Sequence, residues 1–191
     1  MIQTTSSVLT AWSSFYIMTS SSAAALTGLM FVVITLVTGT ERSRPSHDGI
    51  STFSTPTVVH FCAALFVSAI LSAPWGSLVG PAALLGLASL SGLVYVSRLM
   101  HRTKRLTAYN PDLEDWIWYT ILPFLGYGAT LAGAIMLLTI AVKALFVLAG
   151  GVLLLIFIGI HNAWDIVTFL AVGGADDPQS TNQNDEPAQE K

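Results

Sequence analysis

Five long apolar runs dominate this sequence and constrain its fold more than any other feature. A helix needs about 20 apolar residues to cross the hydrocarbon core of a bilayer, which is about 30 Å thick. Each run is near or above that length, and the five runs cover residues 15–37, 53–75, 78–96, 116–142 and 144–172. Only 10% of the 191 residues are charged, against about 25% in an ordinary soluble domain. The sequence therefore predicts an all-α integral membrane protein, built as a bundle of five transmembrane helices.

The two ends of the chain fall outside these runs. Residues 1–14 contain no Lys or Arg, so they lack the positive region of a cleaved secretory signal and are predicted to remain as a short N-terminal segment. Residues 173–191 are rich in Gly, Pro and polar residues, with five acids and one lysine. Such a composition cannot bury enough apolar surface to fold, so a disordered acidic tail is predicted. No separate soluble domain is expected.

The basic residues predict the orientation of the bundle. Two of them follow the first run and four follow the third; they are Arg42 and Arg44, and Arg98, Arg102, Lys104 and Arg105. Short cytoplasmic loops retain Lys and Arg. With five spans both clusters share one face, which is therefore predicted to be cytoplasmic, with the N-terminus outside and the acidic tail inside. The expected location is the plasma membrane, with Lys143 alone on the outer face.

Turn-forming residues predict where the spans separate. The sequence Pro74-Trp75-Gly76 predicts a tight hairpin, which would make the second and third spans antiparallel neighbours. Only Lys143 interrupts the long stretch between the fourth and fifth spans, so that boundary is placed there. Pro123 is predicted to bend the fourth span because it lacks a backbone donor.

Small residues predict one contact face of the first span. Ser20, Ala24 and Gly28 recur every four positions. Membrane helices approach one another closely through small residues, so this stripe is predicted to contact a neighbouring helix. The single cysteine, Cys62, excludes a disulfide framework and is expected to be a small core residue.

Three ionisable residues lie inside the predicted spans, and a fourth lies at the start of one. His60 is in the second span, whereas His161 and Asp165 are in the fifth, four residues apart and therefore on one helix face. At 1.5 Å per residue, His60 and Asp165 would lie about 10 Å inside the cytoplasmic boundary. Glu114 stands at the cytoplasmic start of the fourth span. Intramembrane charges are costly, so the predicted convergence of these residues in the cytoplasmic half is the sharpest functional signal.

Three kinds of site would use this cluster. A metal site would take His60, His161 and Asp165 as ligands, with Glu114 as a fourth, because imidazole and carboxylate suit zinc, iron or manganese. No HExxH or Glu-x-x-His motif supports that site. A b-type haem would take His60 and His161 as axial ligands. A proton or ion path would use the same residues as a relay, but the outer half offers few titratable partners.

Each residue also has a purely structural interpretation. His60 would be a neutral histidine that hydrogen-bonds to a neighbouring helix. Asp165 would pair with His161 or with an arginine after the third span. Glu114 would complement the positive end of a helix dipole.

A small, non-enzymatic membrane protein with a structural or accessory role is the favoured interpretation. An intramembrane metal- or haem-binding protein is the alternative, and a proton- or ion-conducting protein comes third. The expected partners are the lipid bilayer and either a second copy of the chain or a larger membrane complex. The sequence contains no phosphate loop, Ser-His-Asp arrangement or nucleic-acid-binding module, so no nucleic acid is expected as a partner.

Overall fold

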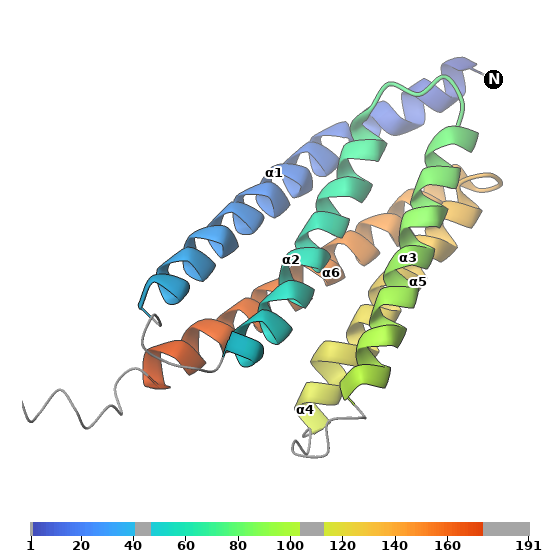
Figure 1. Ribbon diagram of the computed structural model, residues 1–191. Helices are drawn as coiled ribbons and strands as arrows, with labels where there is room; N and C mark the ends of the chain where they lie inside the picture. The colour runs from blue at the N-terminus through green and yellow to red at the C-terminus, as the bar shows by residue number, and fades with distance from the viewer. Residues whose placement is uncertain (1, 41–46, 104–112, 174–191) are drawn as a thin grey trace, which may run out of the picture.

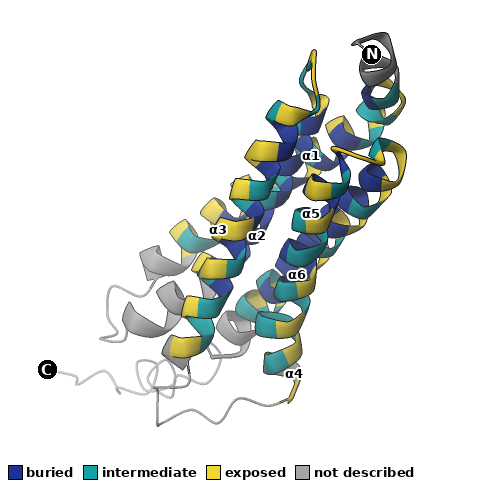
Figure 2. Cartoon of the chain, turned by 90° about the vertical axis from the view of Figure 1, so that its right-hand side faces the viewer, coloured by how far each residue is buried: buried dark blue, intermediate teal, exposed yellow. Residues whose placement is uncertain are grey.

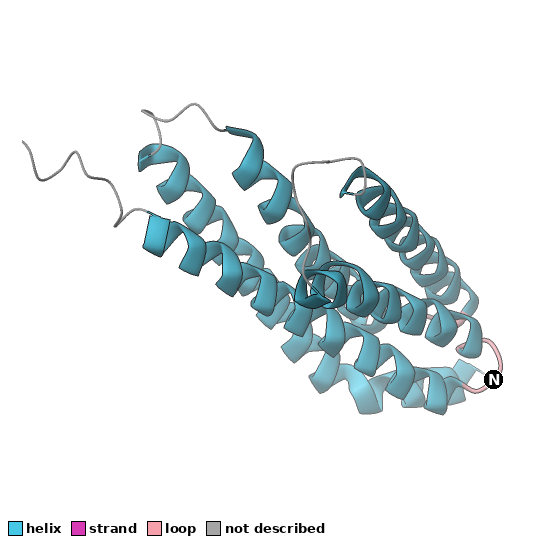
Figure 3. Ribbon diagram, turned by 90° about the horizontal axis from the view of Figure 1, so that it is seen from below, coloured by secondary structure: helices cyan, strands magenta, loops and turns pink. Residues whose placement is uncertain are grey.

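The computed structural model describes residues 2–40, 47–103 and 113–173, and every regular element in these ranges is a helix (Figure 1). In chain order the elements are α1 (Ile2–Thr40), α2 (His47–Ser72), α3 (Val79–Thr103), α4 (Leu113–Trp116), the π-helix η1 (Ile117–Ile121), α5 (Leu122–Met136) and α6 (Ala141–Gly173). Seen from below, helices and short loops account for all of the described chain (Figure 3). The predicted tail beyond Gly173 and four predicted cytoplasmic basic residues lie outside the described residues; these four are Arg42, Arg44, Lys104 and Arg105.

Five helical segments are long and apolar enough to cross a membrane: Val8–Leu36, Thr55–Ser72, Val79–His101, Ile117–Met136 and Ala141–Thr168. Large apolar side chains lie exposed on their outward faces, including Leu29 (61%), Leu87 (66%) and Phe157 (62%) (Figure 2). Soluble monomers rarely expose continuous apolar surface of more than a few hundred Å². The prediction of an all-helical chain with five helices able to span a membrane is therefore confirmed.

Helix α6 is central to the bundle. It packs most extensively against α5 and α2, and also contacts α1. Glycines permit the close approach of α5 and α6: a Cβ added at Gly133 would lie 2.6 Å from the side chain of Leu148, and one at Gly151 would lie 3.2 Å from the carbonyl oxygen of Gly126. The two helices are thus in near-backbone contact, as small residues allow in membrane bundles.

The connection between α2 and α3 contains the predicted turn. Helix α2 ends at Ser72 and α3 begins at Val79. The indole N–H of Trp75 donates a hydrogen bond of 2.6 Å to the carbonyl oxygen of Ile70, and its ring covers Gly80. The turn is therefore held by a side chain that folds back onto both helices.

Helix α3 nevertheless packs mainly against α5, whereas its contact with α2 is small (Figure 1). The ring of Tyr127 fills the space over Gly92, and the hydroxyl of Ser89 donates a hydrogen bond of 2.9 Å to the hydroxyl of Thr130. These contacts favour α5 as the neighbour of α3. The sequence therefore predicted the turn between α2 and α3 correctly. It did not predict that α3 packs mainly against α5.

The buried face of α1 differs from the predicted one. Ala24 is exposed, and a Cβ added at Gly28 would meet no atom within 4 Å. The face that packs is instead defined by two hydrogen bonds. The Tyr16 hydroxyl donates to the carbonyl oxygen of Leu145 (2.9 Å), and the hydroxyls of Thr19 and Ser68 lie 2.9 Å apart. The prediction from small-residue spacing was wrong because the polar contacts select another face.

Two further predictions also need correction. Cys62 is exposed rather than part of the core. The break between α5 and α6 falls at residues 137–140, where the Ile140 N–H donates a hydrogen bond of 2.8 Å to the carbonyl oxygen of Met136. Lys143 lies instead in the first turn of α6 and is exposed. The turn contains no Gly or Pro, so the sequence held no breaker to mark it.

Candidate functional site

A π-helical segment places the first side chain of the candidate site. In η1 (Ile117–Ile121) the backbone widens, and the Leu122 N–H donates to the carbonyl oxygen of Ile117, five residues earlier. Buried Pro123 follows at the start of α5. Proline lacks a backbone donor and its ring clashes with the carbonyl four residues before it, so a regular α-helical turn is disfavoured here. A π-helix therefore precedes Pro123, a feature often found at functional sites, and the bend predicted at Pro123 stays a prediction.

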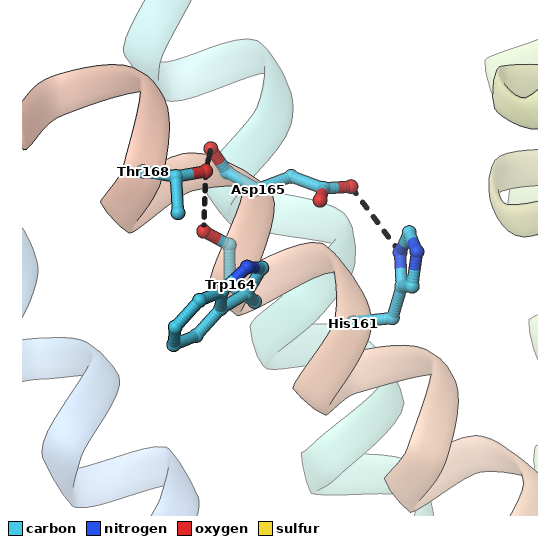
Figure 4. A network of polar contacts seen from close by, with 4 residues as sticks. All are labelled: His161, Trp164, Asp165 and Thr168. Atoms are coloured by element: carbon cyan, nitrogen blue, oxygen red, sulfur yellow. Dashed lines mark hydrogen bonds and ion pairs between the residues drawn. The ribbon is translucent and has the colours of Figure 1, made fainter. Parts of the chain in front are cut away.

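His161 of α6 lies against this segment. Its ring stacks on the indole of Trp118, with centroids 3.6 Å apart and planes 8° from parallel. On its own helix, Nδ1 of His161 lies 3.2 Å from Oδ2 of Asp165 (Figure 4). The predicted pairing of these two residues through their spacing of four is therefore observed. The imidazole is held on one face by an aromatic ring and at its edge by a carboxylate.

Asp165 and its surroundings are partly open. The side chain of His161 is 26% exposed and that of Asp165 is 44% exposed. One turn further along, the Thr168 hydroxyl contacts the backbone carbonyls of Trp164 (3.0 Å) and Asp165 (3.1 Å) (Figure 4). The His161–Asp165 contact thus lies at the surface of the bundle and not in its core.

His60 has a different partner. Its side chain is 2% exposed, and Nδ1 lies 3.0 Å from the hydroxyl of Tyr127, a residue of α5 that is itself 2% exposed. The contact links α2 to α5 across the bundle interior. The structural interpretation of His60, a buried histidine hydrogen-bonded to a neighbouring helix, therefore describes its observed environment.

The described residues do not gather into the predicted metal site. No three His, Cys, Asp or Glu side chains come together to hold a metal ion within the part of the chain that is described. The described contacts of His60 are with Tyr127, whereas those of His161 are with Trp118 and Asp165. The side chain of Glu114, the fourth predicted ligand, lies outside the described residues. Metal binding is therefore unsupported, and the haem prediction for His60 and His161 stays a prediction.

Among the described residues, Asn162 has a buried side-chain amide without a hydrogen-bond partner. Asn162 is 0% exposed, and neither its amide nitrogen nor its amide oxygen forms a hydrogen bond. Both atoms are also sealed from solvent. An unsatisfied buried donor or acceptor costs about 1–3 kcal/mol, so the burial of the Asn162 amide lowers the stability of the bundle.

Three residues of this region carried no predicted role. None of the three, Trp118, Tyr127 and Asn162, was predicted to contact His60, His161 or Asp165. One sequence signal indicates that a neighbouring helix approaches Tyr127: a glycine on each side of it, at positions 126 and 128. The helix that contacts Tyr127 is α2, through His60. Its position depends on how α2 packs on α6, and no sequence motif within either helix predicts that packing.

Comparison of the chain with protein-family models, curated proteins and solved structures finds no match. The function must therefore be inferred from the fold and from the contacts of its polar residues.

Proposed function

We propose that this chain is a small, multi-pass integral membrane protein with a structural or accessory role, whose intramembrane polar residues mainly hold the helices together. The observation that carries the proposal is the pattern of buried polar contacts. They join α1 to α2, α1 to α6, α2 to α5 and α3 to α5, through the pairs Thr19–Ser68, Tyr16–Leu145, His60–Tyr127 and Ser89–Thr130. Interhelical hydrogen bonds, together with van der Waals packing, hold membrane helices against one another in lipid.

The proposed topology places the N-terminus outside and the C-terminus in the cytoplasm. The order of the helices supports it, since the α2–α3 and α5–α6 connections lie at the same end as the N-terminus and the end of α6 lies at the other (Figure 1). Arg98 belongs to the predicted cytoplasmic end of α3 and Lys143 to the predicted outer end of α6. Hereafter the inner half is the half that contains His60, His161 and Asp165, and the outer half contains Tyr16 and Trp75.

Reporter fusions test the topology. A periplasmic or extracellular reporter inserted after Lys143 should be active, and the same reporter at the C-terminus should be inactive. A cytoplasmic reporter should give the reverse result at both positions. An external C-terminus would overturn the orientation. Extraction of the chain from membranes by alkaline carbonate would overturn the membrane assignment itself.

Purification in mild detergent tests the proposed role against its alternative. A structural or accessory protein should be colourless and free of stoichiometric metal, and should elute with a second copy or with a larger complex. A Soret band lost in His60→Ala and His161→Ala would instead identify the haem-binding alternative. Circular dichroism of both variants would establish that they are folded.

A further inference from the structure

A shallow groove runs along one face of α3. It is lined by Leu90, Ser91, Val94, Tyr95 and Arg98 and has a volume of about 340 Å³. Leu90 is 50% exposed and Val94 is 49% exposed. The groove is thus an apolar, outward-facing surface with one cation at its end.

The cation has no counterpart in the part of the chain that the structure describes. Arg98 is exposed, and no ion pair or hydrogen bond to it occurs within the described residues. It stands three positions before His101, the last residue of the apolar segment of α3, or about 4.5 Å along the helix at 1.5 Å per residue. Arginine at such a depth extends toward the headgroup region, where phosphate is the complementary anion.

The length of the groove matches one leaflet. Leu90 and Arg98 are eight residues apart, which corresponds to about 12 Å along a helix. Half of a bilayer core is about 15 Å thick. When Arg98 lies at the headgroup boundary, Leu90 and Val94 therefore line the depth that a lipid acyl chain occupies. The small side chain of Ser91 keeps the groove open. Its hydroxyl donates a hydrogen bond of 2.9 Å to the carbonyl oxygen of Leu87.

We propose that this groove on α3 is a binding site for one anionic phospholipid of the cytoplasmic leaflet. The guanidinium of Arg98 binds the phosphate, and Leu90 and Val94 contact an acyl chain. Charge complementarity selects an anionic headgroup over a zwitterionic one, since the cytoplasmic leaflet is negatively charged and a zwitterionic lipid adds a cation beside Arg98. The proposal rests on the membrane embedding proposed above.

Native mass spectrometry of the full chain tests this site. The protein is reconstituted in nanodiscs of phosphatidylglycerol and phosphatidylcholine, and the lipids it retains on release are counted. Wild type should retain one phosphatidylglycerol in preference to phosphatidylcholine. Arg98→Gln should reduce this preference about five-fold, the change that corresponds to about 1 kcal/mol for one basic residue at a membrane surface. Arg98→Lys should retain part of it, because the charge remains and the bidentate geometry is lost.

Two further variants separate a specific site from general charge. Lys143→Gln removes an exposed cation at the opposite end of the bundle and should leave the preference unchanged. Val94→Trp fills the groove, keeps Arg98 and should lower retention of both lipids. Equal losses in Arg98→Gln and Lys143→Gln, or no loss in Arg98→Gln, would overturn the site. Failure of wild type to enter nanodiscs would instead overturn the proposed function, so the two failures are distinguishable.

Discussion

The two halves of the bundle use polar residues differently. In the outer half, the polar groups of Tyr16 and Trp75 donate to backbone carbonyls of Leu145 and Ile70. In the inner half, His60 pairs with a tyrosine and His161 with an aspartate, while Asn162 has no partner. Backbone carbonyls are fixed by the helix that carries them, whereas paired side chains can change partner or protonation. The outer half is therefore held mainly by bonds to backbone carbonyls, an outer clamp to which the hydroxyl pair Thr19–Ser68 is added. The pairs that contain a histidine lie in the inner half.

Substitution of a buried glycine is expected to have the largest effect on the stability of the bundle. A Cβ at Gly92 would overlap the ring of Tyr127, whereas one at Gly86 on the same helix would meet nothing within 4 Å. Gly92→Ala should therefore destabilise the bundle by about 1–3 kcal/mol through overpacking and should disturb the contact of Tyr127 with His60. Gly86→Ala should be neutral or slightly stabilising, because alanine is the better helix former.

Thermal unfolding in detergent, followed by circular dichroism, checks this pair of variants. The midpoint of Gly92→Ala should fall clearly below that of wild type and that of Gly86→Ala. Equal midpoints for the two variants would contradict the packing of α3 on α5.

The next largest effect separates the two halves directly. Tyr127→Phe leaves Nδ1 of buried His60 without its described partner, and an unsatisfied buried group costs about 1–3 kcal/mol. Tyr16→Phe removes a hydrogen bond to the backbone carbonyl of Leu145. That carbonyl remains part of the backbone hydrogen bonding of α6, and hydrogen bonds between membrane helices average about 0.6 kcal/mol. Tyr127→Phe should therefore lower the free energy of unfolding more than Tyr16→Phe.

Unfolding of both variants in mixed micelles measures the difference. A larger loss in Tyr16→Phe would mean that the outer clamp, rather than the inner pair, dominates the stability of the bundle. His60→Phe combined with Tyr127→Phe should recover part of the loss, since both buried polar groups are then removed together.

The sequence was informative where the physical constraint is local. Run length and missing charges specify five helices, and the spacing of four between His161 and Asp165 specifies their contact. By contrast, the partner of His60 depends on which helices meet in three dimensions, and so does the buried face of α1. The small residues Ser20, Ala24 and Gly28 have the spacing of a packing face. The hydrogen bonds of Tyr16 and Thr19 to other helices instead bury a different face of α1. Local patterns thus predict elements better than their neighbours.

Substitution of Asn162 by leucine is expected to raise the stability of the bundle, whereas Gly92→Ala and Tyr127→Phe should lower it. Its amide is buried and unpaired, so Asn162→Leu replaces it with an apolar side chain of similar size and removes the cost of desolvation. Such replacements are nearly neutral or stabilising, and a gain of up to about 1 kcal/mol is expected. Asn162→Asp, which buries a charge at the same place, should destabilise strongly. A marked loss of stability in Asn162→Leu would show that the amide binds a polar group in the membrane.

The smallest expected effect concerns the exposed pair of His161 and Asp165. The two side chains are 26% and 44% exposed. Where water reaches that exposed surface, their coupling energy in a double-mutant cycle with His161→Gln and Asp165→Asn should be about 0.5 kcal/mol or less. It should vanish in about 1 M salt, where charges are screened beyond about 3 Å. A coupling well above 1 kcal/mol that survives such salt would mean that the pair is desolvated in the bilayer. The inner half would then hold a buried ion pair, and His161 and Asp165 would contribute to the stability of the bundle as His60 and Tyr127 do.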